Sequence, residues 1–151
     1  MPPSAKEKNA VQRAVTALLD ELAPERVLKR GEPQLRVSVE QHRTPTGCVL
    51  QGATAAVSVS WFAEPGANAP LGELHVVVWR GVVSRRSSPR RTDGGGATIV
   101  RELVLHPIER PADGCLWRAT DGMEFDTPAL AARCIALLAE QMAAEGPVAA
   151  E

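Results

Sequence analysis

The sequence of 151 residues has no tyrosine, only two phenylalanines and only three tryptophans, so aromatic side chains make up 3% of it. Proteins that read RNA on the surface of a sheet stack the bases on exposed aromatic side chains. Most aromatic residues of this chain stand at positions patterned for burial, so the sequence does not favour base stacking.

Strong charge and long apolar segments are also missing. The net charge is -1 and the pI is about 6.3, so no overall field gathers nucleic acid or anionic lipid. No window approaches the roughly 18 apolar residues that a membrane span needs, and the start of the chain lacks the pattern of a secretory leader. We expect a cytoplasmic protein without a membrane partner. The excess of arginine over lysine, with abundant alanine, hints at a bacterial source.

Paired cysteines and metal-ligand spacings are absent as well. Cys48, Cys115 and Cys134 are odd in number, widely spaced and set among apolar residues, which favours reduced core thiols over disulfides or a zinc site. No nucleophile motif and no pair of histidines at metal-binding spacing occurs. The sequence therefore gives no catalytic residue, metal or cofactor, and it favours a protein that is not an enzyme.

Two helices are predicted, one near each end of the chain. Ser4 and Glu7 form a capping box, and apolar residues then recur at helical spacing from Val11 to Leu22 until Pro24 ends the helix. Thr127 is the predicted N-cap of the second helix, which carries an apolar stripe that includes Leu130, Cys134, Ile135, Leu137, Leu138 and Met142.

Between the helices, the apolar residues alternate with a period of two, which indicates strands. A turn at 44–47 and a turn-rich stretch at 64–70 separate the first three strands, Gly52 is interpreted as a bulge, and Pro107 should end the fourth. The last strand is short enough to be an edge strand. Five strands are predicted, at 34–40, 48–62, 71–84, 97–106 and 115–119.

These elements predict one α+β domain over residues 1–151, in the order α-β-β-β-β-β-α. Because the connections are short, consecutive strands should pair antiparallel, with both terminal helices packed on the sheet. We expect disordered tails at 1–3 and 147–151 and a mobile hairpin loop at 85–96. The pattern leaves open whether the two helices cover the same face.

The third predicted strand is apolar on both of its sides. One side carries Leu74, Val76, Val78 and Val82, and the other carries His75, Val77, Trp79 and Val83. If both helices cover the first side, the second remains as an exposed apolar patch, and such a patch marks a partner surface. The leading hypothesis is a binding or assembly module that uses this face for self-association, as in a homodimer, for a protein partner or for an apolar ligand. If one helix covers each face, no patch remains.

An alternative function rests on the arginine-rich segment 80–91, which holds Arg80, Arg85, Arg86, Arg90 and Arg91. Arginine suits phosphate and carboxylate groups, so this segment could contact nucleic acid or an acidic partner. A solvated loop explains the same residues and is favoured over nucleic acid. Gly94-Gly95-Gly96 is not a phosphate loop, because a strand follows it where such a loop needs a helix.

Two further interpretations concern single sites. His75 follows Glu73 on the third strand, so a small enzyme with a His75-centred pocket is a second alternative, and His42 and His106 are weaker candidates. The acidic stretch 121–126 lacks the ligand spacing of a calcium loop. A turn and favourable charge at a helix N-terminus explain that stretch better.

Overall fold

The structure is a computed structural model that describes residues 5–22, 39–63, 71–83, 97–110 and 114–145. The predicted α+β class, with a helix first and last and an antiparallel sheet between, is confirmed, but the sheet has seven strands rather than five. The strands lie side by side in chain order, so each pairs with its neighbours in sequence. The elements are α1 (Ala5–Glu21), β1 (Glu40–Thr44), β2 (Gly47–Gln51), β3 (Ala55–Phe62), β4 (Glu73–Arg80), β5 (Thr98–Arg110), β6 (Gly114–Ala119), β7 (Glu124–Phe125) and α3 (Thr127–Glu145).

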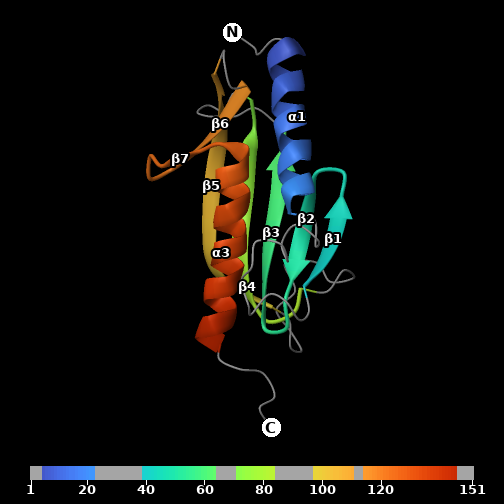
Figure 1. Ribbon diagram of the computed structural model, residues 1–151, viewed down its shortest axis with the longest axis vertical. Coiled ribbons are helices and arrows are strands. Elements are labelled where there is room, and N and C mark those ends of the chain that lie inside the picture. The colour runs from blue at the N-terminus through green and yellow to red at the C-terminus, as the bar shows by residue number, and fades with distance from the viewer. Residues whose placement is uncertain (1–4, 23–38, 64–70, 84–96, 111–113, 146–151) are drawn as a thin grey trace.

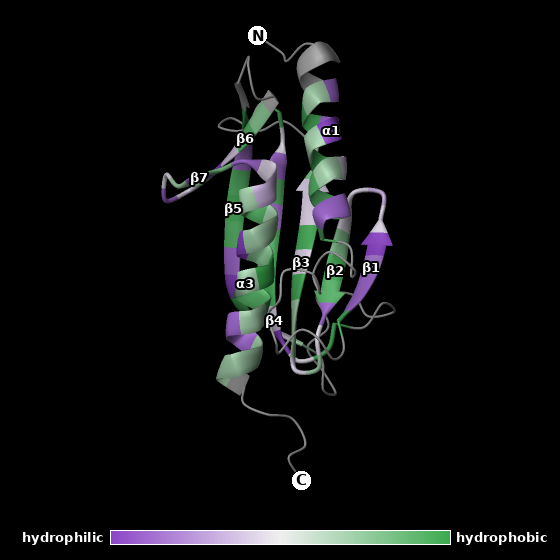
Figure 2. Ribbon diagram, viewed as in Figure 1, coloured by the Kyte–Doolittle hydropathy of each residue, from purple (hydrophilic) through white to green (hydrophobic). Residues whose placement is uncertain are grey.

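Both helices lie on the same side of the sheet (Figure 1). They contact each other, α3 packs on β3 and β4, and α1 reaches β5 and β6. One core cluster therefore joins apolar residues of both helices to one face of the sheet. Figure 2 shows the contrast between the hydrophilic edge strand β1 and the more hydrophobic β2 beside it.

The predicted apolar stripe of α1 is confirmed. Val11, Val15, Leu18, Leu19 and Leu22 are buried in the core. Burial of such a stripe, at about 1.5–3 kcal/mol for each large side chain, holds the helix on the sheet. The capping residue Ser4 and the terminating Pro24 lie outside the described residues.

Polar contacts also tie α1 to β1. The side chain of Gln41 donates hydrogen bonds to the carbonyl oxygens of Leu19 and Leu22, at 3.4 and 3.1 Å, near the end of the helix. Arg43 forms an ion pair of 2.8 Å with Asp20. The Gln41 hydrogen bonds supply a donor to carbonyl groups in the last turn of the helix, where intrahelical donors run out.

The prediction of one long strand over 48–62 is wrong, because a tight turn divides it into β2 and β3. Gly52, interpreted as a bulge, begins this turn and donates a backbone hydrogen bond of 2.8 Å to Ala55. A Cβ atom at Gly52 would lie 2.6 Å from the sulfur of Met142 on α3, so the turn passes close beneath the helix. The run of small and apolar residues around Gly52 is also typical of a continuous strand, so the sequence did not indicate the turn.

Pro107 does not end its strand, as the sequence predicted, but lies within β5 opposite Trp117 of β6. β4 pairs with β5 only as far as Leu105, so Pro107 lies beyond the partner strand on that side. Proline has no backbone N–H. Its absence costs a strand little at a position where no neighbouring strand offers a carbonyl oxygen to accept that hydrogen bond. β5 therefore continues to Arg110.

Three other boundaries differ from the predictions. Most of the strand predicted at 34–40 lies outside the described residues, and β1 begins where that range ends. β4 is shorter than predicted, because Gly81 turns the chain with a φ of 98°. The strand β6 is not at the edge, since the two-residue strand β7 pairs with it. The predicted turn at 44–47 is confirmed, with Thr44 paired to Gly47.

The helix α3 begins with a different cap from the predicted Thr127. The carboxylate of Asp126 accepts a hydrogen bond of 2.8 Å from the backbone N–H of Ala129, which makes Asp126 the N-cap. The hydroxyl of Thr127 instead accepts a hydrogen bond of 3.3 Å from the indole of Trp117. The predicted apolar stripe from Leu130 to Leu138 is buried. Neither α1 nor α3 is long and apolar enough to cross a membrane.

Candidate functional site: the helix-free face of the sheet

The face of the sheet opposite α1 and α3, termed the helix-free face, is the surface on which the leading hypothesis depends. The registers show which side chains it carries, because residues of a strand alternate between the two faces. Val57, Val59 and Trp61 of β3 belong to the core under the helices, so the residues between them point the other way. The face carries Val49, Gln51, Ala56, Ser58, Ser60, Phe62, Glu73, His75, Val77, Trp79, Ile99, Glu102, Val104, His106, Ile108, Leu116 and Arg118.

Trp79 lies on this face, as the sequence indicated, but its side chain is only 6% exposed. It packs against Ala56 and Ala97 in a second small apolar cluster, which Val49, Val77 and Val83 extend. The predicted apolar patch is therefore partly closed by its own neighbours. Val77 remains half-buried, and the solvent-exposed part of the face lies beyond Trp79.

The buried amide of Gln51 holds the end of the face next to Trp79. Its Nε2 group donates to the carbonyl oxygens of Gly52, Ala55 and Gly81 at 2.8, 3.1 and 3.0 Å. Its Oε1 atom accepts a hydrogen bond of 2.8 Å from the backbone N–H of Val83. One side chain thereby joins the β2–β3 turn to the chain that leaves β4. A glutamine within an apolar run gives no signal for such a role, so Gln51 could not be selected from the sequence.

His75 lies between two carboxylates on the same face. Its Nε2 atom is 3.0 Å from the Oε1 atom of Glu73, and its Nδ1 atom is 3.4 Å from the Oε2 atom of Glu102 on β5. The ring of Phe62 meets the imidazole edge-on, with 4.7 Å between the ring centres. The imidazole is half-exposed and held in place from three strands. The sequence singled out Glu73 as a neighbour of His75, but it gave no sign of Glu102 or Phe62.

Two apolar side chains of this face are open to solvent. Phe62 is 49% exposed and Ile99 is 58% exposed. Val104, Ile108 and Leu116 are half-buried and extend the apolar area along β5 and β6. Ile99 lies opposite Trp79 because a bulge shifts the register of the β4–β5 pair, so strict alternation could not have placed it.

Charged and polar groups lie among these apolar residues. Arg118 pairs with Glu124 of β7 through an ion pair of 2.5 Å. His106 is the neighbour of Arg118 on β5, and its buried Nδ1 atom has no hydrogen-bond partner among the described residues. The helix-free face is therefore mixed in character, like the surfaces through which subunits associate, and unlike a core face.

The sequence also selected an arginine-rich segment and an acidic stretch. Arg85, Arg86, Arg90 and Arg91 lie outside the described residues, so contact with nucleic acid through them stays a prediction. Asp121 accepts a hydrogen bond of 2.9 Å from the backbone of Met123, which is a turn contact. Across the described ranges, no group of three or more histidine, cysteine and acidic side chains could hold a metal ion.

The three cysteines are buried, as the sequence predicted, and they form no disulfide within the described residues. Burial raises the pKa of the Cys48 thiol to about 11, although a hydrogen bond with Gln41 and the charge of Arg43 oppose this. Burial, assisted by Cys48, raises the pKa of the Cys134 thiol to about 12. Both thiols stay protonated at neutral pH, and a protonated thiol is a poor nucleophile.

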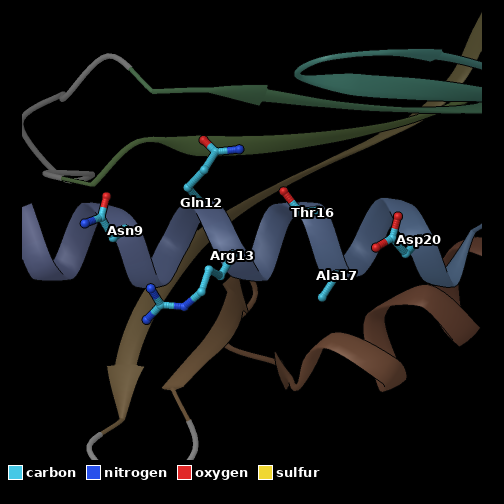
Figure 3. A pocket seen from close by; sticks show the side chains of 6 residues that line it. All are labelled: Asn9, Gln12, Arg13, Thr16, Ala17 and Asp20. Carbon is cyan, nitrogen blue, oxygen red and sulfur yellow. The ribbon is translucent and has the colours of Figure 1, made fainter.

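A hollow of about 440 Å³ runs along α1 (Figure 3). The described residues that line it all come from this one helix, and Asp20 among them already pairs with Arg43. A binding site needs groups that converge from several sides. We therefore do not select this hollow as the functional site.

Comparisons with models of known protein families, with curated proteins and with solved structures give no match for this chain. We therefore infer the function from the residues of the site.

Proposed function

We propose that the protein is a non-enzymatic assembly module that binds a second copy of itself through the helix-free face. The observation that carries the proposal is the placement of both helices on one side of the sheet while Phe62 and Ile99 stay open on the other. Between them the half-buried Val77 and Val104 continue the apolar area, and a contiguous apolar area on a sheet face that no described helix covers marks a contact surface.

A second copy is the partner that suits this face best. In a two-fold dimer the same patch lies on both sides of the interface, so apolar area meets apolar area without a specialised partner. The face also carries opposite charges, with Glu73 and Glu102 on β4 and β5 and Arg118 on β6. Such a mixture allows two copies to pair acidic groups with basic groups around an apolar centre.

The proposal is tested by the mass of the protein in solution. We expect sedimentation velocity to find a dimer that dissociates on dilution, and the double variant Phe62→Glu, Ile99→Glu to be a folded monomer. Met123→Glu is the matched control, because Met123 is 57% exposed but lies in the β6–β7 turn. A monomer at every concentration of the unaltered chain, or equal dissociation by the control, contradicts the proposal.

Acid–base chemistry at His75 is a second candidate function. The observation that favours it is the carboxylate of Glu73 at 3.0 Å from Nε2, which orients the imidazole, while the longer 3.4 Å contact between Nδ1 and Glu102 would give way to a substrate. A generic activated ester such as p-nitrophenyl acetate is a simple probe. If His75 reacts with it, His75→Gln should remove the hydrolysis, whereas His42→Gln should not; equal rates in both variants reject this candidate.

A further inference from the structure

A second cavity lies on the other face of the sheet, between α3 and the β4–β5 pair. Its volume is about 310 Å³, at the lower end of the range of about 300–1,000 Å³ for small-molecule sites. Leu137, Glu140, Gln141 and Ala144 line it from one stripe of α3, since residues three and four apart share a helix face. Val78 and Leu137 are buried and give the cavity an apolar floor.

The bulge in β5 gives this cavity an unusual wall. In a regular strand, consecutive residues point to opposite faces, yet Val100 and Arg101 both line the cavity. Val78 pairs with Arg101 while Trp79 pairs with Ile99, so Val100 is the extra residue of the bulge. A bulge turns a side chain away from its regular direction and often lies beside a binding site. Here it places an apolar side chain and a guanidinium together.

Arg101 is the cationic group of the cavity that has no counter-charge. Its guanidinium has no hydrogen bond or ion pair with any residue in the described part of the chain. Glu140, the acidic residue of the lining, is paired with Arg133 at 3.6 Å instead. A guanidinium beside an apolar floor suits a carboxylate that carries an apolar body, because its planar fork can donate two parallel hydrogen bonds.

We propose that this cavity binds a small amphipathic anion, a carboxylate with a short acyl or aromatic body. The carboxylate pairs with Arg101, and the apolar body lies on Val78, Val100 and Leu137. The site lies on the opposite side of the sheet from the helix-free face, so it is independent of the proposed self-association.

Isothermal titration calorimetry with sodium octanoate tests the proposal, with 1-octanol and octylamine as probes of equal chain length. We expect one octanoate to bind per chain, and octanol and octylamine to bind at least about tenfold more weakly, since a charged hydrogen-bonded pair is lost. Arg101→Gln should weaken octanoate binding by a similar factor. Arg118→Gln, which removes an arginine from the opposite face, should leave it unchanged.

A second variant tests the location through volume rather than charge. Ala144→Trp should fill the cavity and abolish octanoate binding while leaving the circular dichroism spectrum and the sedimentation coefficient unchanged. Three results would overturn the proposal: no binding of octanoate to the unaltered protein, binding that survives both Arg101→Gln and Ala144→Trp, or octanol binding as tightly as octanoate. None of these results bears on whether the protein is a dimer.

Discussion

The indole Nε1 atom of Trp79 on β4 donates a hydrogen bond of 2.9 Å to the hydroxyl of Ser58 on β3. The two residues are not directly opposite, since Ser58 pairs with Val77 and Trp79 pairs with Ala56. The bond therefore runs diagonally across the β3–β4 pair, next to the contact between Trp79 and Ala56. It satisfies the polar atom of a side chain that is otherwise buried in an apolar cluster.

Ser58→Ala should destabilise the protein by about 1–2 kcal/mol, because it leaves the buried indole N–H without its acceptor. The free energy of unfolding in urea measures this loss. Ser60→Ala is the matched control on the same strand and face, and its hydroxyl has no hydrogen bond among the described residues, so its effect should stay within about 0.5 kcal/mol. Equal losses in the two variants would mean that the bond contributes nothing measurable.

Local signals explain what could be predicted from the sequence. The stripes of both helices and the turn before Gly47 depend on spacing within a few residues, and all are confirmed. The division of 48–62 could not be found in this way, because contacts with residues distant in sequence hold the turn at 52–54, such as the hydrogen bond from Gly81 to Thr54 and the close approach of Gly52 to Met142.

Contacts between residues distant in sequence also determine most of the candidate site, and these could not be predicted. Alternation correctly placed Trp79 and His75 on one face, but the burial of Trp79 depends on Ala97, which is distant in sequence. Glu102 reaches His75 only through the register of β4 with β5, and the bulge beside Val100 shifts that register near Trp79. The sequence of one strand does not determine its register with the next strand, so these contacts could be found only from the structure.

Gln51→Leu should destabilise the protein by several kcal/mol, about 1–3 kcal/mol for each buried backbone group that loses its partner. The amide has two hydrogens for three carbonyl oxygens, so the three donated contacts share them and their energies do not simply add. Gln51→Glu should be at least as harmful, because a carboxylate cannot donate to any of these oxygens. Urea unfolding monitored by tryptophan fluorescence gives both values.

Gln41→Leu is the companion variant for this series. Gln41 also bonds to backbone carbonyl groups, but it is half-buried, its contact with Leu19 is long at 3.4 Å, and the carbonyl oxygen of Leu19 keeps the backbone N–H of Leu22 as a donor. Its loss should therefore cost about 1 kcal/mol or less. If Gln51→Leu were no more harmful than Gln41→Leu, the buried amide would not be holding the end of the helix-free face.

Asp126→Ala should cost about 1 kcal/mol of stability, because the N-cap of α3 is lost. Asp126→Asn keeps an oxygen acceptor and loses only the favourable charge at the helix N-terminus, so its cost should be a few tenths of a kcal/mol. Thr127→Val tests the assignment, since it removes the hydroxyl that bonds to Trp117 and leaves the cap in place. A larger change in the near-ultraviolet spectrum with Thr127→Val than with Asp126→Ala is the expected distinction.

The buried thiols predict a loss of stability in alkali. Cys48 and Cys134 have an ordinary pKa of 9.0, which burial raises to about 11 and about 12 in the folded chain. Above pH 9 the unfolded chain releases these protons and the folded chain keeps them, so rising pH favours unfolding. The stability that the protonated thiols contribute to the folded chain is complete below pH 9. It is lost as the pH rises toward their pKa values in the folded chain. Between about pH 8 and pH 10, the titration of each thiol should lower the free energy of unfolding by about 1.4 kcal/mol.

The composition makes this effect measurable, because the chain has no tyrosine and only three lysines to titrate in the same range. Urea unfolding at the two pH values should show a fall of about 3 kcal/mol for the unaltered protein. The double variant Cys48→Ala, Cys134→Ala begins less stable, since it loses buried side-chain volume, but should lack most of the alkaline fall. The same pH dependence in both proteins would mean that other groups, and not these two thiols, destabilise the fold in alkali.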